Sequence, residues 1–133
     1  MEKNELALFN GTGNRTFCSK ITNEEEEKKE LFNALEECDV LLNDCVGQEI
    51  LIKDVYCEER EIVDDKGEVR KKYRTILFDM DGQTYATGSY GIFNVIKKLF
   101  AIYGVPTWEN GVKVKVSKRP IGNGKSTLTL TLV

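Results

Sequence analysis

The stretch "TILFDMDGQTYATGSYGIFNVIKKLFAIYG", residues 75–104, contains the signals of a strand, a tight turn, a second strand and a helix in direct succession. The run "TILFD" is apolar and rich in residues that favour strands. The turn that follows contains Asp81 and Gly82, a pair that suits a hairpin because glycine accepts a positive φ. From residue 90 the apolar spacing becomes helical, and the residues that repeat at this spacing are Ile92, Ile96, Leu99 and Tyr103.

The segments on either side of this stretch are predicted as further strands. Upstream, "EILIKDVYCEEREIV" is connected by the turn "DDKGE" to "VRKKYRTILFD". Downstream, "VKVKVSK" and "STLTLTLV" alternate polar and apolar residues, which is the period of a half-buried strand. The order is therefore β-β-β-α-β-β. It predicts a mainly β protein with a five-stranded Greek-key barrel of the OB type, whose helix plugs the barrel between the third and fourth strands.

The first part of the chain differs in composition from the rest. Residues 1–47 are expected to form an N-terminal extension with one acidic helix, and residues 48–133 the barrel, within one compact domain overall. The helix is predicted over "TNEEEEKKELFNALEE", because Thr22 or Asn23 can cap its first turn and glutamates there favour the helix dipole. Its expected apolar stripe consists of Leu31, Phe32 and Leu35.

Composition excludes several classes of chemistry. The sequence has no histidine, which excludes Ser-His and Cys-His nucleophilic catalysis, and its four cysteines form no Cys-x-x-Cys pair. We therefore expect no metal site, no cofactor and free thiols, at Cys18, Cys38, Cys45 and Cys57. The absence of an export signal and of a long apolar run predicts no membrane association and a location in the cytoplasm.

The segment "KRPIGNGKST", residues 118–127, has the appearance of a phosphate-binding loop. That loop requires a glycine five residues before the Gly-Lys pair, where this chain has Arg119, and it must lead into a helix. Here an alternating strand pattern follows instead. The segment is better explained as a tight basic hairpin turn between the last two strands.

The segment "TILFDMDGQT" resembles the first motif of the haloacid dehalogenase family of phosphatases. That resemblance would make Asp79 a nucleophile, Asp81 an acid/base and the chain a small Mg-dependent phosphatase. After Gly82, however, the sequence offers one helix and a single acidic residue, Glu109, which cannot complete the magnesium site of that family. A hairpin turn is the favoured interpretation, and the phosphatase is kept as an alternative function.

Charge is distributed unevenly along the sequence. Residues 1–68 contain 19 acidic and 8 basic residues, a net charge of −11, whereas residues 69–133 contain 3 acidic and 11 basic residues, a net charge of +8. This segregation favours a basic face that binds a polyanion; the alternative is a mixed surface on which these charges intermingle in space.

A surface that binds single strands combines cations for phosphates with aromatic rings for bases. By alternation, Phe78 is expected on the wet, cationic side of its strand with Lys72 and Arg74, and Tyr73 on the inner side with Leu77 and Val114. The predicted nucleic-acid-binding residues are Lys53, Arg60, Arg70, Lys72, Arg74, Phe78, Tyr85, Trp108, Lys113, Lys115, Lys118, Arg119 and Lys125.

The segment from "ILFDMDGQTYATGS" to "VKVKVSKRP", followed by "GNGKSTLTLTLV", resembles the single-stranded DNA-binding proteins of phages and related mobile elements of Gram-positive bacteria. The similarity extends back through "CVGQEILIKDVYCEER" and covers about two thirds of the chain. The resemblance implies a small OB-type protein that coats single-stranded DNA, without catalysis, during phage DNA replication. Replication proteins are possible further partners, and the oligomeric state stays open. A protein-interaction module with a DNA-mimicking acidic helix is a further alternative.

Overall fold

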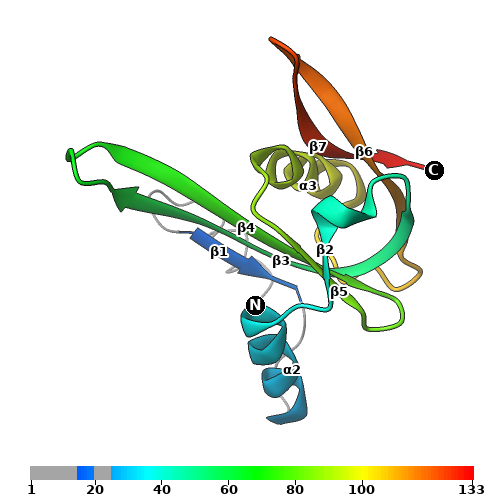
Figure 1. Ribbon diagram of the computed structural model, residues 1–133. Helices are drawn as coiled ribbons and strands as arrows, with labels where there is room; N and C mark the ends of the chain where they lie inside the picture. Colours follow the sequence, from blue (N-terminus) through cyan, green and yellow to red (C-terminus); the bar gives the residue numbers. More distant parts are fainter. Residues whose placement is uncertain (1–14, 20–24) are drawn as a thin grey trace.

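A computed structural model describes residues 15–19 and 25–133 of the chain. The strands, in chain order, are β1 (Arg15–Cys18), β2 (Val40–Leu41), β3 (Glu49–Val63), β4 (Val69–Asp79), β5 (Thr84–Thr87), β6 (Val112–Gly122) and β7 (Lys125–Leu132). The helices are α2 (Glu25–Glu36) and α3 (Tyr90–Tyr103), and one 3-10 turn covers Leu42–Cys45. The protein is mainly β, with a single sheet curled into a half-barrel (Figure 1).

The predicted succession of three strands, a helix and two strands is confirmed by β3 to β7. Helix α3 begins where the Ser89 hydroxyl accepts a hydrogen bond from the backbone N–H of Ile92, at 3.3 Å. It ends at Gly104, whose φ of 81° favours glycine and whose N–H donates to the carbonyl of Phe100.

The described residues form seven strands where five were predicted, and the two additional strands are short. β1 pairs antiparallel with β3, and the two residues of β2 pair parallel with β5. The two residues of β2 are too few for an alternation to be recognised, and the sequence beside β1 has no Asp-Gly turn like the one that marks β5, which is equally short. Both come from the part of the chain that was expected to form only an extension.

β3 is the central strand of the sheet, whose order is β2-β5-β4-β3-β6-β7. β4 pairs along one edge of β3, while the other edge is shared by β6 at Glu49–Ile52 and by β1 farther along. Past these neighbours, residues 60–72 of β3, the turn and β4 form a two-stranded ribbon that projects from the body (Figure 1). We call this ribbon the arm.

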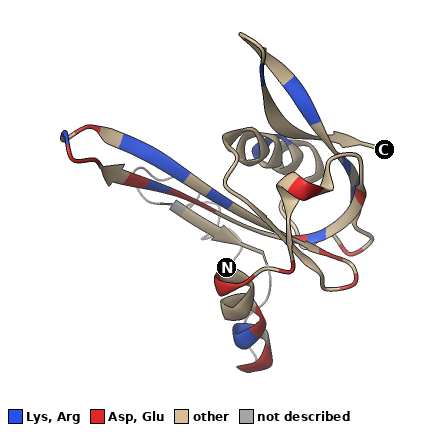
Figure 2. Cartoon of the chain, in the orientation of Figure 1, with Lys and Arg blue, Asp and Glu red and all other residues tan. Residues whose placement is uncertain are grey.

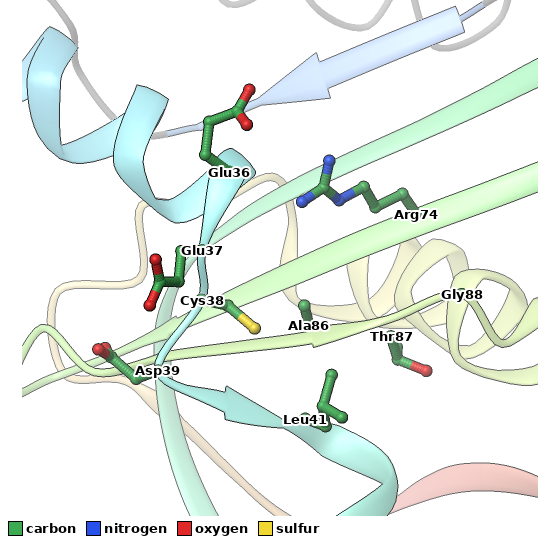
Figure 3. A pocket seen from close by; sticks show the side chains of 9 residues that line it. All are labelled: Glu36, Glu37, Cys38, Asp39, Leu41, Arg74, Ala86, Thr87 and Gly88. Atoms are coloured by element: carbon green, nitrogen blue, oxygen red, sulfur yellow. The ribbon is translucent and has the colours of Figure 1, made fainter.

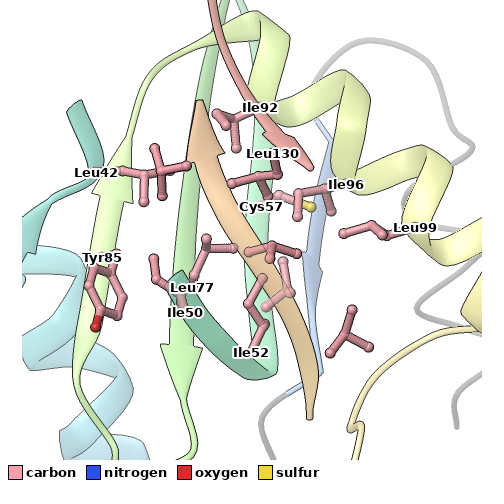
Figure 4. Close-up of a cluster of buried hydrophobic side chains, with 14 of the residues drawn as sticks. Leu42, Ile50, Ile52, Cys57, Leu77, Tyr85, Ile92, Ile96, Leu99 and Leu130 are labelled. Atoms are coloured by element: carbon pink, nitrogen blue, oxygen red, sulfur yellow. The ribbon is translucent and has the colours of Figure 1, made fainter. Parts of the chain in front are cut away.

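The main hydrophobic core lies between the inner face of the curled sheet and α3 (Figure 4). Ile52, Leu77 and Val114 from the sheet and Ile92 and Ile96 from the helix are fully buried in it. Tyr73 is half-buried and packs against this core, so its predicted inward orientation is confirmed. Its ring centroid lies 4.8 Å from that of Phe93 and 5.0 Å from that of Tyr90.

A second, smaller cluster lies on the outer face of the sheet, opposite α3 and beneath α2. It contains Tyr56, Ile76, Phe78 and Ala86 from the sheet and Ala34 from the helix. The outer position of Phe78 agrees with the predicted alternation, but its predicted exposure is wrong, because α2 covers this face and leaves Phe78 4% exposed. Alternation along a strand assigns a side chain to a face, and it contains no information on what covers that face.

Helix α2 presents a narrower apolar stripe than predicted. Ala34 is buried and Leu31 and Leu35 are half-buried, whereas Phe32 is 62% exposed and does not belong to the stripe. Residues 31, 34 and 35 share one side of a helix, and residue 32 is rotated about 100° away from residue 31. The predicted N-cap, Thr22 or Asn23, lies outside the described residues.

Gly91 provides a test of the packing between α3 and β7. A Cβ atom at this position would lie 2.5 Å from Thr127 Oγ1 and closer still to the carbonyl oxygen of Leu128. We expect Gly91→Ala to lower the free energy of unfolding by about 1–3 kcal/mol, because overpacking outweighs the better helix propensity of alanine. Ala101→Ser, at an exposed position of the same helix, is the control and should cost only about 0.5 kcal/mol in urea denaturation. An equally stable Gly91→Ala protein would contradict this packing.

Candidate nucleic-acid interface

Four cations gather on the outer face of the arm and at its base. In the antiparallel register of β3 and β4, Arg60 lies opposite Lys72 and Glu58 lies opposite Arg74. Residues that lie opposite one another share a face, and alternate residues along a strand do as well. Arg60, Arg70, Lys72 and Arg74 therefore all lie on one side of the sheet. Figure 2 shows how basic residues are distributed along the arm.

The same register brings acidic residues of β3 close to basic residues of β4. Glu59 Oε2 of β3 accepts from Lys71 Nζ of β4 at 3.2 Å on the inner face. Within β3 itself, Arg60 pairs with Glu58 at 2.6 Å on the outer face. Charges that are segregated along the sequence thus partly intermingle in space. Lys72 has no ion pair among the described residues, so it is the outer-face cation that is most available to a phosphate.

Arg70 is positioned by the turn at the tip of the arm. Its Nε donates to Asp64 Oδ2 at 3.1 Å. The backbone N–H groups of Glu68 and Lys66 donate to the Asp64 carboxylate, and together with Arg70 they lower its pKa. Both partners are solvent-accessible, so this pair orders the turn while the Arg70 side chain remains 67% exposed.

Arg74 lies at the base of the arm and contacts α2. Its Nη2 donates to the carbonyl oxygen of Leu35 in the last turn of the helix. Beside it, the hydroxyl of Tyr56 donates to Glu58 Oε1 at 2.5 Å. Burial and this hydrogen bond raise the pKa of Tyr56 above its usual range. The cation at the base of the arm is therefore engaged by the helix that covers the outer face.

The three aromatic residues predicted to bind bases are all buried. Phe78 is covered by α2, and Tyr85 is 8% exposed with its hydroxyl donating to Asp79 Oδ2 at 3.0 Å. Burial and Asp79 raise the pKa of Tyr85 to about 12. Trp108 is 8% exposed, and its indole N–H donates to the carbonyl of Gly104 at 3.2 Å. The expectation that these rings are accessible is wrong for the structure described.

Sequence reasoning overlooked an accessible aromatic residue, Tyr90, which is 58% exposed beside Tyr73. It occupies the first position of α3, directly after the capping Ser89 and before the buried stripe begins. Because Tyr90 lies outside the apolar repeat of the helix, the sequence already indicated that it would not belong to the buried stripe. Tyr90 lies toward the inner face of the arm, away from the four outer cations.

The remaining predicted cations lie on other parts of the sheet. Lys113 and Lys115 alternate with buried valines along β6, and Lys113 pairs with Glu49 at 3.5 Å. Lys118 and Arg119 line a hollow of about 550 Å³ between α3 and the β6–β7 hairpin, together with Lys98 and aliphatic side chains. Lys125 is exposed at the start of β7, and Lys53 is half-buried at the bulge in β3.

The predicted hairpin at the end of β6 is confirmed. Gly122 and Gly124 have φ values of 100° and 72°, and Lys125 pairs with Gly122 at the start of β7. Because a strand follows the glycines, this turn presents no helix N-terminus to a phosphate.

Asp79 and Asp81 form a turn. Asp79 Oδ1 accepts from the backbone N–H groups of Asp81 and Gln83, at 2.8 and 2.9 Å. The other carboxylate oxygen accepts from Tyr85, so the side chain organises the backbone of the hairpin. Within residues 15–19 and 25–133, no three acidic or cysteine side chains group as a metal site would require. Nothing in this geometry supports the phosphatase alternative.

The cationic ribbon on a curled β-sheet is the arrangement of a protein that binds a nucleic-acid backbone. In agreement with it, residues 11–133 match the family model described as "Phage Single-stranded DNA-binding protein". The chain belongs to this family, and it binds single-stranded DNA. Comparisons with curated proteins and with solved structures gave no match. Among the described residues there is no helix with the length and apolarity needed to cross a membrane.

The turn role of Asp79 is testable. We expect Asp79→Asn to keep the fold within about 1 kcal/mol, because an asparagine oxygen can accept the same two backbone hydrogen bonds. Thermal melts and titrations with oligo(dT) should both be close to those of the parent protein. A phosphatase activity that disappears in this variant would instead assign Asp79 a catalytic role.

Proposed function

We propose that the chain coats single-stranded DNA without catalysis during phage DNA replication, and that the strand lies along the outer face of the arm. The observation that carries this proposal is the alignment of Arg60, Arg70, Lys72 and Arg74 on one side of the β3–β4 ribbon. A row of cations can follow a phosphate backbone without reading its sequence, which is what a coating protein requires.

We further infer that the half-barrel is a partly open barrel of the OB type formed by residues 48–133, with residues 1–47 as its extension. The succession β3, β4, β5, α3, β6, β7 supports this, as does the adjacency of β3 to both β4 and β6. In such a barrel β4 and β5 are the second and third strands. Oligonucleotides bind to the face of these strands, between the first-to-second and fourth-to-fifth loops.

The two loops that flank this face are the tip of the arm and the β6–β7 turn. Lys118 and Arg119 on the β6–β7 hairpin, with Lys98 from α3, provide a second cationic patch, and no carboxylate is among the described residues that line it. We propose that the strand continues toward this patch. Replication proteins are candidate partners of the coated strand, and the bacterial cytoplasm is the expected compartment.

Neutralising cations on the outer face of the arm tests the proposed path of the DNA strand. We expect Arg70→Gln with Lys72→Gln to reduce the slope of log K against log salt for oligo(dT) by about 1.4, since each single-strand phosphate contact contributes about 0.7. At about 0.1 M salt, with about 1 M as the reference, this corresponds to roughly fivefold weaker binding per contact.

The matched control is Lys71→Gln, which removes the same charge from the inner face of the same strand. It should leave the salt slope unchanged, and a thermal melt will reveal any destabilisation from the loss of the partner of Glu59. An unchanged slope in the double variant, or an equal loss in the control, would place the strand elsewhere.

A further inference from the structure

The outer face that the arm leads into is occupied by α2. Four side chains of β3, β4 and β5 lie beneath the helix, and we call them the covered patch: Tyr56, Ile76, Phe78 and Ala86. The register places Phe78 on the same face as Lys72 and Arg74, so the covered patch continues the row of cations. Two rings and an aliphatic side chain beside cations are the composition of a surface on which bases pack.

The contact between α2 and this face is incomplete. Ala34 is the one buried side chain among the described residues of the helix, and Phe32 points away from the sheet. A hollow of about 480 Å³ lies between the C-terminal end of α2, Arg74 and β5 (Figure 3). A second hollow of about 200 Å³ is lined by Ala34 of the helix and by Phe78 and Thr84 of the sheet. A helix with so little buried surface is weakly held.

The polar contacts of α2 imitate those of a nucleic acid. Arg74 donates to the carbonyl of Leu35, and the carbonyl end of a helix carries a partial negative charge. Exposed glutamates, among them Glu25, Glu26 and Glu36, extend this negative character along the helix. A phosphate carries a full charge and is a stronger acceptor for the guanidinium than a carbonyl.

The link after α2 is attached to the sheet independently of the helix. Asp39 Oδ2 accepts from the backbone N–H and the hydroxyl of Thr84, at 2.9 and 3.1 Å. The backbone N–H of Asp39 in turn donates to the Thr84 hydroxyl oxygen at 3.0 Å. The helix can therefore leave the sheet while residue 39 stays fixed.

We propose that the covered patch is a base-binding surface and that single-stranded DNA displaces α2 from it. In the bound state a phosphate takes the place of the Leu35 carbonyl on Arg74, and bases pack against Phe78 and Tyr56. This inference rests on the proposed path along the outer face of the arm. The helix then competes with DNA for the covered patch. The apparent affinity for DNA is the intrinsic affinity multiplied by the fraction of molecules in which α2 has left the patch.

The first test loosens the helix at its buried position. Ala34→Gln places a larger polar side chain against Phe78 without lowering helix propensity greatly, and we expect it to tighten binding to oligo(dT) about three- to tenfold. Phe32→Ala, on the exposed side of the same helix, should change the affinity less than twofold. A folded Ala34→Gln protein with unchanged or weaker affinity would overturn the proposal.

The second test reads the position of the helix directly. Cys18→Ser and Cys38→Ser leave only the buried thiols of Cys45 and Cys57, and Ala34→Cys then adds a reporter beneath α2. We expect its alkylation by a water-soluble maleimide to accelerate when oligo(dT) saturates the protein, while a Phe32→Cys reporter reacts quickly with or without DNA. Slower or unchanged alkylation of the reporter in the saturated complex would show that α2 stays seated.

The third test separates this inference from the proposed path. Phe78→Leu keeps an apolar side chain and removes the ring, and in the Ala34→Gln background it should weaken binding about tenfold through the loss of stacking. If Arg70→Gln with Lys72→Gln weakens binding while the variants at 34 and 78 have no effect, the path stands and the displacement is wrong. If the two cation substitutions have no effect, the path itself is wrong.

Discussion

The antiparallel pairing of β3 with β4 is the constraint on which the rest of the structure depends. It extends from Ile52 opposite Asp79 to Val63 opposite Val69, and it assigns every side chain of the two strands to the core or to the outer face. The single irregularity lies between Ile52 and Asp54, where an extra residue in β3 allows both Ile52 and Val55 to point into the core. Without that bulge, one half of β3 would present its polar side chains to the core.

The pairing also decides which cations of the arm are held by buried carboxylates and which remain accessible. Exposed ion pairs contribute little to stability, so a phosphate can replace Asp64 beside Arg70 at small cost. Lys71 differs, because its partner Glu59 is 3% exposed and its carboxylate would lose a partner on breaking the pair. Neighbouring residues of one strand therefore differ: Lys71 is held in an ion pair with a buried carboxylate, whereas Arg70 and Lys72 remain accessible on the outer face.

Much of the fold could be predicted from the sequence because its main elements have strong local signals. The bounds of β3 and β4 follow from turns with Asp and Gly, and α3 follows from its apolar repeat. β2 could not be predicted, because two residues form a strand only through pairing with Tyr85 and Ala86, which are distant in sequence. Ion pairs such as Lys71 with Glu59 were missed for the same reason, since they depend on register.

The candidate site was harder to predict because the accessibility of a residue depends on segments distant from it in sequence. The face of Phe78 could be derived from alternation, whereas its burial depends on a helix more than forty residues earlier in the chain.

The covering of Phe78 by α2 also has a physical effect in the protein without DNA. Exposed together, Phe78, Ile76 and Tyr56 would form an apolar patch that favours aggregation. An acidic helix protects such a patch in water. The helix also contacts Arg74, a cation that would bind a phosphate more strongly than the Leu35 carbonyl. In the proposed displacement, the patch is therefore exposed only when single-stranded DNA is present to cover it.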